Sequence, residues 1–316
     1  STVAFSCGDV GTGLYNAGGN IIGYSVNGTE KLRIDSAGRL LHGVTTATPV
    51  CSTANSRLQI HNNASVLTAS FTGYGAHSGG SIIALGKSRS STVGDATGAV
   101  QSGDTLGDIR FGGSDGTDMQ TTAAQILTKV DGSVSSNSIP GAIIFQTSDG
   151  SSFTEKLRLR AAGGITFNGD TAAANALDDY EEGTFTPQFM VSGTESSGVS
   201  YSSRAGSYTK IGREVTVNLM FELNNNGSTN GQVEFGNLPF TVADTLSNTT
   251  HEASGSVSYM INMSDSTYFL TVSAGHNSTK LFLLGQVSHD TGFDHIQRNQ
   301  TTNNFSIRCS CTYFTS

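Results

Sequence analysis

The chain has 316 residues, of which 13% are charged and 39 are Gly. With 17 Lys and Arg against 25 Asp and Glu, its formal net charge is −8, so it lacks the basic surface that nucleic-acid binding needs. The sequence contains no run of 18 apolar residues and no basic-then-apolar segment at its start, so we expect neither membrane insertion nor a signal peptide.

The first 170 residues contain a repeat. Thr29–Ile34 reads Thr-Glu-Lys-Leu-Arg-Ile, and residues 154–159 read Thr-Glu-Lys-Leu-Arg-Leu. Both copies continue to an Ala-Gly pair, at Ala37-Gly38 and Ala162-Gly163. Apolar residues step by two in each copy, which predicts a strand, a glycine turn and a second strand.

Two related units each place a short apolar run before an Asp-Gly turn. Residues 109–111 precede Asp115-Gly116, and residues 143–145 precede Asp149-Gly150. Residues 82–85 read as a degenerate member without the turn. Because large apolar residues are thinly spread here, each repeat buries little alone. We therefore expect residues 1–170 to form an elongated, intertwined β shaft in which three chains share one apolar axis.

Residues 171–183 are predicted to be a short linker or hinge. They begin with a run that favours one or two helical turns and continue with Asp178, Asp179, Glu181 and Glu182. Four carboxylates suit Ca²⁺ or a pair of glycosidase acids. Neighbouring residues of an extended chain point to opposite sides, which favours the hinge over a convergent site.

Residues 184–316 carry stronger alternation and predict a C-terminal β-sandwich or jelly-roll-like knob. Apolar residues recur at every second position from Val215 to Leu223 and from Val257 to Met263. The same pattern places Cys309 and Cys311 on an inward face, as core residues rather than metal ligands. Only four cysteines occur, so we expect no disulfide scaffold. The fold class is thus predicted to be all-β.

Several segments carry a family resemblance. In the shaft they are residues 57–60, 103–109, 140–143 and 155–158, and in the knob residues 180–187, 206–212 and 238–240. Together they resemble tail-fibre and receptor-binding proteins of bacteriophages, particularly those of marine cyanobacterial phages. The resemblance implies a homotrimer located in the virion and assembled in the bacterial host cytoplasm. It also implies that the N-terminal end binds other tail or virion proteins and that the knob faces the host cell.

The predicted binding residues lie in one turn-rich loop of the knob: His289, Asp290, Phe293, Asp294 and His295. An aromatic ring offers a stacking face for a sugar, and polar groups offer partners for its hydroxyls. The alternative is an ordinary exposed loop. We expect no metal ligands and no cofactor.

The expected function is adsorption of a phage to its host by a structural fibre without enzymatic activity, through a surface glycan or an outer-membrane receptor. Three weak sites on one axis would bind together by avidity. Two alternatives stay open: a capsid-fibre or tail-adaptor connector, and a polysaccharide depolymerase.

Overall fold

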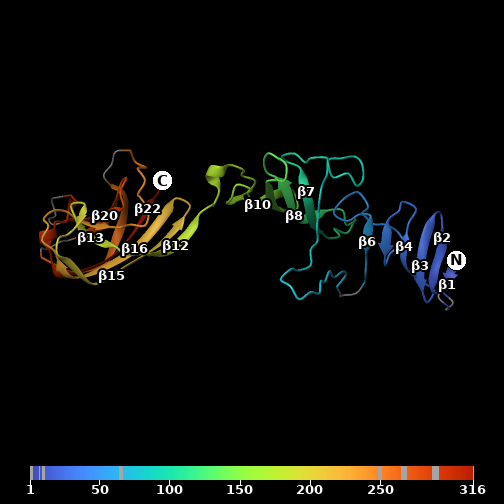
Figure 1. Ribbon diagram of the computed structural model, residues 1–316, viewed down its shortest axis with the longest axis horizontal. Helices are drawn as coiled ribbons and strands as arrows, with labels where there is room; N and C mark the ends of the chain where they lie inside the picture. The colour runs from blue at the N-terminus through green and yellow to red at the C-terminus, as the bar shows by residue number, and fades with distance from the viewer. Residues whose placement is uncertain are drawn as a thin grey trace. The chain divides into compact units, whose positions relative to one another are not determined.

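The computed structural model describes residues 3–315 apart from 7, 9–10, 64–66, 248–250, 265–268 and 287–291. It divides the chain into two compact units, Ser1–Ala176 and Leu177–Ser316. Within the described ranges the regular elements are β-strands and two 3-10 turns, which confirms the predicted all-β class (Figure 1). No helix in the described part of the chain is long and apolar enough to span a membrane.

Unit 1 contains two sheets. The first has six strands in chain order: β1 (Val3–Ser6), β2 (Gly13–Gly18), β3 (Ile21–Val26), β4 (Thr29–Ile34), β5 (Leu40–His42) and β6 (Leu58–Ile60). The second has five, with neighbours again consecutive: β7 (Thr105–Gly112), β8 (Thr122–Val130), β9 (Gly141–Ser148), β10 (Phe153–Leu159) and β11 (Ile165–Phe167). All pairs are antiparallel except β5 with β6.

The sequence repeat is a repeat of structure. In the first copy Ile34 of β4 pairs with Leu40 of β5, and in the second Leu159 of β10 pairs with Ile165 of β11. The predicted strand, glycine turn and strand are confirmed in both. The preceding strands also correspond, because Ile22 of β3 pairs with Ile34 as Ile143 of β9 pairs with Leu159.

A β-bulge at the repeat's Lys explains why both copies keep Glu and Arg three positions apart. The register skips Lys31 in β4 and Lys156 in β10. In a regular strand, residues three apart face opposite sides, but one extra residue brings them to the same side. Arg158 accordingly donates from Nε and Nη2 to Glu155 at 2.9 and 2.8 Å, and Arg33 makes the same paired contact with Glu30.

The second sheet has one closed and one open face. Leu127, Ile144, Arg158 and Thr166 form a cross-strand row on the closed face, and Leu127, Ile144 and Thr166 are buried. On the other face, a cross-strand row runs through all five strands: Ile109, Ile126, Phe145, Leu157 and Phe167. Ile109, Phe145 and Phe167 of this row are exposed.

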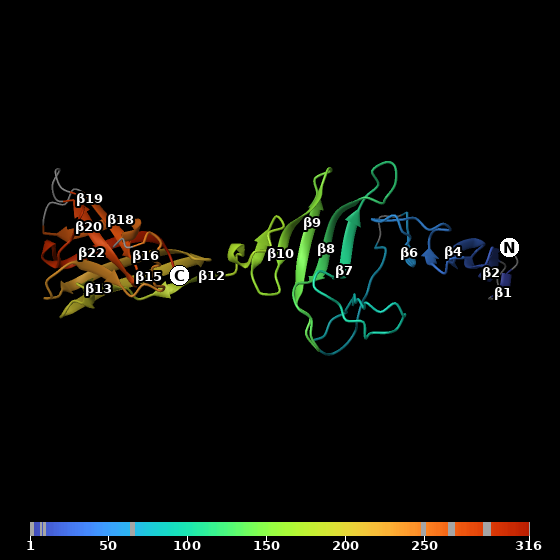
Figure 2. The ribbon, with the colours of Figure 1, turned by 90° about the horizontal axis from the view of Figure 1, so that it is seen from above.

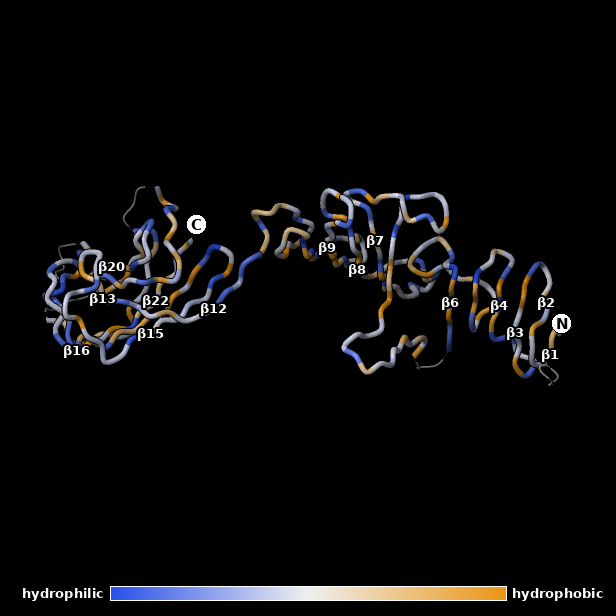
Figure 3. The backbone as a smooth tube through the Cα atoms, in the orientation of Figure 1, coloured by the Kyte–Doolittle hydropathy of each residue, from blue (hydrophilic) through white to orange (hydrophobic). Residues whose placement is uncertain are grey.

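The first sheet repeats this asymmetry. Ile22, Ile34, Leu40 and Leu58 form a row of exposed apolar residues across β3, β4, β5 and β6, whereas Leu41, on the opposite face, is fully buried. Figure 3 shows apolar stretches along the strands of unit 1. Both sheets of unit 1 therefore leave an apolar face open in the single chain.

Residues 82–85, predicted as a degenerate strand repeat, form no strand in the structure. Ile82, Ile83 and Leu85 are exposed. The other members of the repeat are followed by an Asp-Gly turn that returns the chain alongside itself, and this member lacks the turn.

The predicted linker, residues 171–183, is partly a strand. Its helical tendency appears as a single 3-10 turn, η1 (Ala173–Asn175), just before the boundary between the units. Residues 180–183 begin β12 (Tyr180–Phe185), which pairs with β15 (Val199–Ile211). Lys210 of β15 donates to the Asp179 carboxylate, which further ties this segment to unit 2.

Unit 2 is one hydrogen-bonded sheet of eleven strands (Figures 1 and 2). The order is β12, β15, β16 (Glu214–Asn226), β22 (Thr301–Phe314), β18 (His251–Met263), β19 (Phe269–Gly275), β20 (Lys280–Gln286), β17 (Val233–Gly236), β13 (Gln188–Val191) and β14 (Thr194–Glu195), with β21 (Asp294–His295) beside β20.

The sheet folds over its own core. The ring of Phe189 in β13 packs on Phe221 in β16 and on Phe305 in β22, with centroids 6.4 and 6.2 Å apart. The sequence predicts a β-sandwich or jelly-roll-like knob, and the structure has two packed layers that belong to one continuous sheet. The core therefore lies entirely within unit 2.

Alternation predicts the buried faces of β16 and β22 correctly. Every second residue from Val215 to Leu223 is buried, as is the set from Phe305 to Tyr313 that includes both cysteines. In β18 the prediction is right for Val257 and Met263, which pack on the core, and wrong for Tyr259 and Ile261. Bulges between Val257 and Tyr259 and between Ile261 and Met263 change the face of the residues between them. Tyr259 is exposed there, and Met260 packs on the core in its place.

Candidate functional site

The five predicted binding residues fall in two groups. His289 and Asp290 lie outside the described residues. Phe293 and Asp294 are exposed, and His295 is half-buried. Asp294 and His295 form the short strand β21, whose partners in β20 are Gly285 and Leu284. The structure therefore places three of the five at the edge of an ordered sheet.

A groove of about 510 Å³ opens beside β21. Asp294 and His295 line it, together with Gln232, Gly285, Ile296, Gln297, Asn299 and Gln300. Four carboxamides, one carboxylate and one imidazole thus surround one space. Carboxamides both donate and accept hydrogen bonds, which suits the hydroxyl groups of a sugar.

The segment that carries these residues is held in place by its backbone. Ile296 is buried, its N–H donates to Leu283 O at 2.9 Å, and its carbonyl accepts from Val233 N–H at 2.8 Å. Gln297 N–H donates to the side chain of Gln300 at 2.7 Å as part of a capping box before η2 (Arg298–Gln300). Because these hydrogen bonds already hold the backbone in place, the groove should lose little conformational entropy when it binds a ligand.

Two exposed aromatic rings pair next to this segment. Phe293 immediately precedes β21, and its ring meets that of Phe269 edge to face with centroids 5.5 Å apart. About half of each side chain is exposed. An exposed ring face beside polar groups is the arrangement that stacks on the apolar side of a sugar ring.

Behind the groove, His295 belongs to a cluster of three rings. Its centroid lies 5.0 Å from Phe282 and 5.4 Å from His251, and His251 lies 5.3 Å from Phe282. His251 Nδ1 is 3.1 Å from the Ser273 hydroxyl. Burial, and secondarily the neighbouring His295, lowers the pKa of His251, so the neutral imidazole suits this place.

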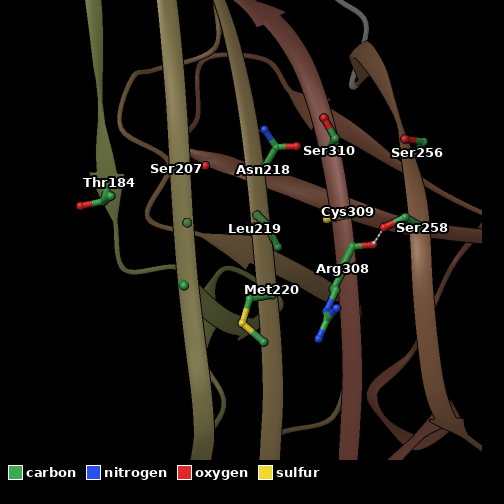
Figure 4. Close-up of a pocket in the computed structure, with 12 residues that line it drawn as sticks. Thr184, Ser207, Asn218, Leu219, Met220, Ser256, Ser258, Arg308, Cys309 and Ser310 are labelled. Carbon is green, nitrogen blue, oxygen red and sulfur yellow. Dashed lines mark hydrogen bonds between the residues drawn. The ribbon is translucent and has the colours of Figure 1, made fainter.

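A second hollow, of about 620 Å³, lies on the outer face of the unit 2 sheet (Figure 4). Thr184, Ser207, Asn218, Ser310 and Ser256 lie across successive strands there, with Met220 and Arg308 beside them. It is the larger of the two spaces, but its exposed lining is mainly apolar, whereas polar atoms dominate the lining of the groove beside β21.

Three of the four acidic residues near the unit boundary have individual partners. The Asp179 carboxylate accepts from Lys210, Glu181 accepts from the hydroxyl of Tyr208, and Glu182 accepts from that of Tyr180 at 3.2 Å. These contacts tie the acids to separate side chains rather than to a common centre.

Sequence reasoning found the carboxylate and the imidazole of the groove, and the aromatic ring of Phe293 that precedes them, but missed the carboxamides of the groove. Gln297, Asn299 and Gln300 follow the predicted loop directly, so the clustering of amides after His295 was the available signal. Gln232 comes from a distant loop that reaches the groove through an isolated bridge to Gln297, and no local pattern could identify it.

Comparisons with known proteins give no relatives: no protein-family model matches this chain, and no curated protein matches it. The residues and their geometry are therefore the basis for a functional proposal.

Proposed function

We propose that this chain is a structural fibre protein of a phage particle that attaches the particle to a glycan on the host cell surface. The observation that carries the proposal is the groove beside β21, which four carboxamides and Asp294 line, together with the exposed Phe269–Phe293 ring pair that precedes Asp294 in the chain. Binding through stacking and hydroxyl contacts requires no reacting group, so the proposed protein is not an enzyme.

The open faces of unit 1 support assembly into a fibre. Contiguous apolar surface on a monomer usually marks an interface. Both sheets of unit 1 carry such a surface at equivalent repeat positions, for example Ile34 and Leu159. Chains arranged around one axis would cover these faces with each other, and the family resemblance proposes three.

The test is adsorption of the labelled full-length protein to a panel of cyanobacterial hosts, with and without enzymatic removal of surface polysaccharide. We expect saturable binding that is lost on stripping. Phe293→Ala removes one stacking face and should weaken binding by about 10-fold, as expected for a loss of about 1.5 kcal/mol.

Phe314→Ala is the matched control, because Phe314 is an equally exposed aromatic at the end of β22 and does not line the groove. It should bind as the unchanged protein does. If neither protein adsorbs to any host, the chain is better explained as a connector within the virion. Release of reducing ends from the polysaccharide would instead indicate a depolymerase.

A further inference from the structure

Three side chains with metal-ligating atoms meet at one end of the unit 2 sheet, and none of them lines the groove beside β21. Asp244, Glu252 and His276 each place one such atom within 4.8 Å of the other two. Asp244 is exposed, whereas Glu252 and His276 are half-buried. They come from three segments: the stretch before β18, the start of β18, and the turn between the neighbouring strands β19 and β20 (Figure 2).

Backbone hydrogen bonds hold these segments together. Asn277 N–H donates to Val242 O, and Val242 N–H donates to Ser278 O, both at 2.9 Å. The turn that carries His276 is therefore fastened to the stretch that carries Asp244. On its other side, this stretch is fastened to the end of β22 by Ala243 N–H, which donates to Phe314 O at 2.7 Å.

Three hydrogen bonds to one of its oxygens orient the Glu252 carboxylate. Its Oε2 accepts from the N–H of Thr245 at 2.9 Å, from the Thr245 hydroxyl at 2.7 Å and from the N–H of Leu246 at 3.0 Å. Neighbouring donors that orient a carboxylate in this way are typical of metal ligands. They also fix Glu252 relative to Asp244, the residue before Thr245.

The chemistry of Asp244, Glu252 and His276 favours the binding of a cation. Two carboxylates this close repel each other, and a divalent ion between them removes that repulsion. One imidazole nitrogen with two carboxylate oxygens suits Zn²⁺ or a similar transition metal, whereas Ca²⁺ prefers six to eight oxygens. Bonds of about 2.1 Å in a tetrahedral site set ligand atoms about 3.4 Å apart, so atoms that lie within 4.8 Å of one another need to close by at most about 1.4 Å.

We infer that unit 2 binds one divalent transition-metal ion of the zinc class through Asp244, Glu252 and His276, with water completing the coordination. The ion joins three segments at one end of the sheet and so stabilises unit 2. This site goes beyond the proposed attachment function and does not depend on it, because none of the three residues lines the groove beside β21.

The experiment is calorimetric titration of the full-length, EDTA-treated protein with Zn²⁺ and, separately, with Ca²⁺ at pH 7.5. We expect one Zn²⁺ per chain and at least 10-fold weaker binding of Ca²⁺. His276→Ala and Glu252→Gln should each weaken Zn²⁺ binding by at least 10-fold. Zn²⁺ should also raise the thermal midpoint of unit 2 in the unchanged protein, but not in His276→Ala.

Two matched variants control for surface binding. His61→Ala removes a half-buried imidazole from unit 1, and Glu222→Gln neutralises a carboxylate on the outer face of unit 2. Both should bind Zn²⁺ as the unchanged protein does. The inference is overturned if Zn²⁺ does not saturate at one per chain, if the control variants weaken binding as much as the site variants, or if Ca²⁺ binds more tightly than Zn²⁺.

Discussion

At the scale of single residues, we expect His251 to make stability depend on pH. Because the pKa of His251 is lowered in the folded protein, the folded state binds a proton less readily than the unfolded chain does. The stability that is present above the unfolded pKa of about 6.5 is therefore lost as pH falls. Between pH 7.5 and 5.5 we expect the thermal midpoint of unit 2 to fall, with a slope of at most about 1.4 kcal/mol per pH unit from this group. His251→Gln keeps a polar partner for Ser273 without titrating, and should flatten the slope.

The carboxylate of Asp149 should not contribute to this pH dependence. Hydrogen bonds from the backbone and hydroxyls of Ser151 and Ser152 hold the pKa of Asp149 well below its usual range, so this carboxylate stays ionised throughout the window. His61→Gln, in unit 1, should leave the melting of unit 2 unchanged. Equal pH slopes for the unchanged protein and His251→Gln would refute the assignment to His251.

At the scale of elements, the bulged repeat depends on its ion pair. Arg158 makes two hydrogen bonds to Glu155 and lies 3.4 Å from Asp131, and its side chain is only 12% exposed. Arg158→Met leaves these carboxylates without their partner and should lower the free energy of unfolding of unit 1 by about 2 kcal/mol. Chemical denaturation measures this loss. Lys156→Met removes the same charge from the exposed bulge position and should cost less than about 0.5 kcal/mol.

How far the sequence predicts these elements depends on whether the signal is local. The repeat at Thr29 and Thr154 predicts two hairpins, and both are present, because strand alternation and a glycine turn are encoded within a few residues. The bulge at Val257 escapes prediction, because register is decided by the neighbouring strand. For the same reason, Gln232 of the groove and the meeting of Asp244 with His276 are set by tertiary contacts that no spacing reveals.

At the scale of the whole molecule, the two units bury their apolar residues in different ways. Unit 2 encloses its own core, in which Phe189, Phe221 and Phe305 are fully buried. Unit 1 instead covers one face of each sheet and leaves the other open. Unit 2 therefore buries a core within a single chain, whereas the association proposed for unit 1 would cover its open faces.

Neighbouring residues of β9 offer a test, because Phe145 belongs to the open face and Ile144 to the closed face. Phe145→Ser should weaken self-association by about 2 kcal/mol per chain while each chain stays folded, since the proposed association would bury the exposed part of Phe145 between chains. Ile144→Ser should unfold unit 1 itself, since Ile144 is 1% exposed within the chain. Sedimentation across a concentration series separates these outcomes, and circular dichroism reports folding.

Phe314→Ser, an exposed substitution in unit 2, should leave the oligomer unchanged. A protein that sediments as a folded monomer before any substitution would contradict the role proposed for the open faces, because an apolar row spanning five strands would then remain in water.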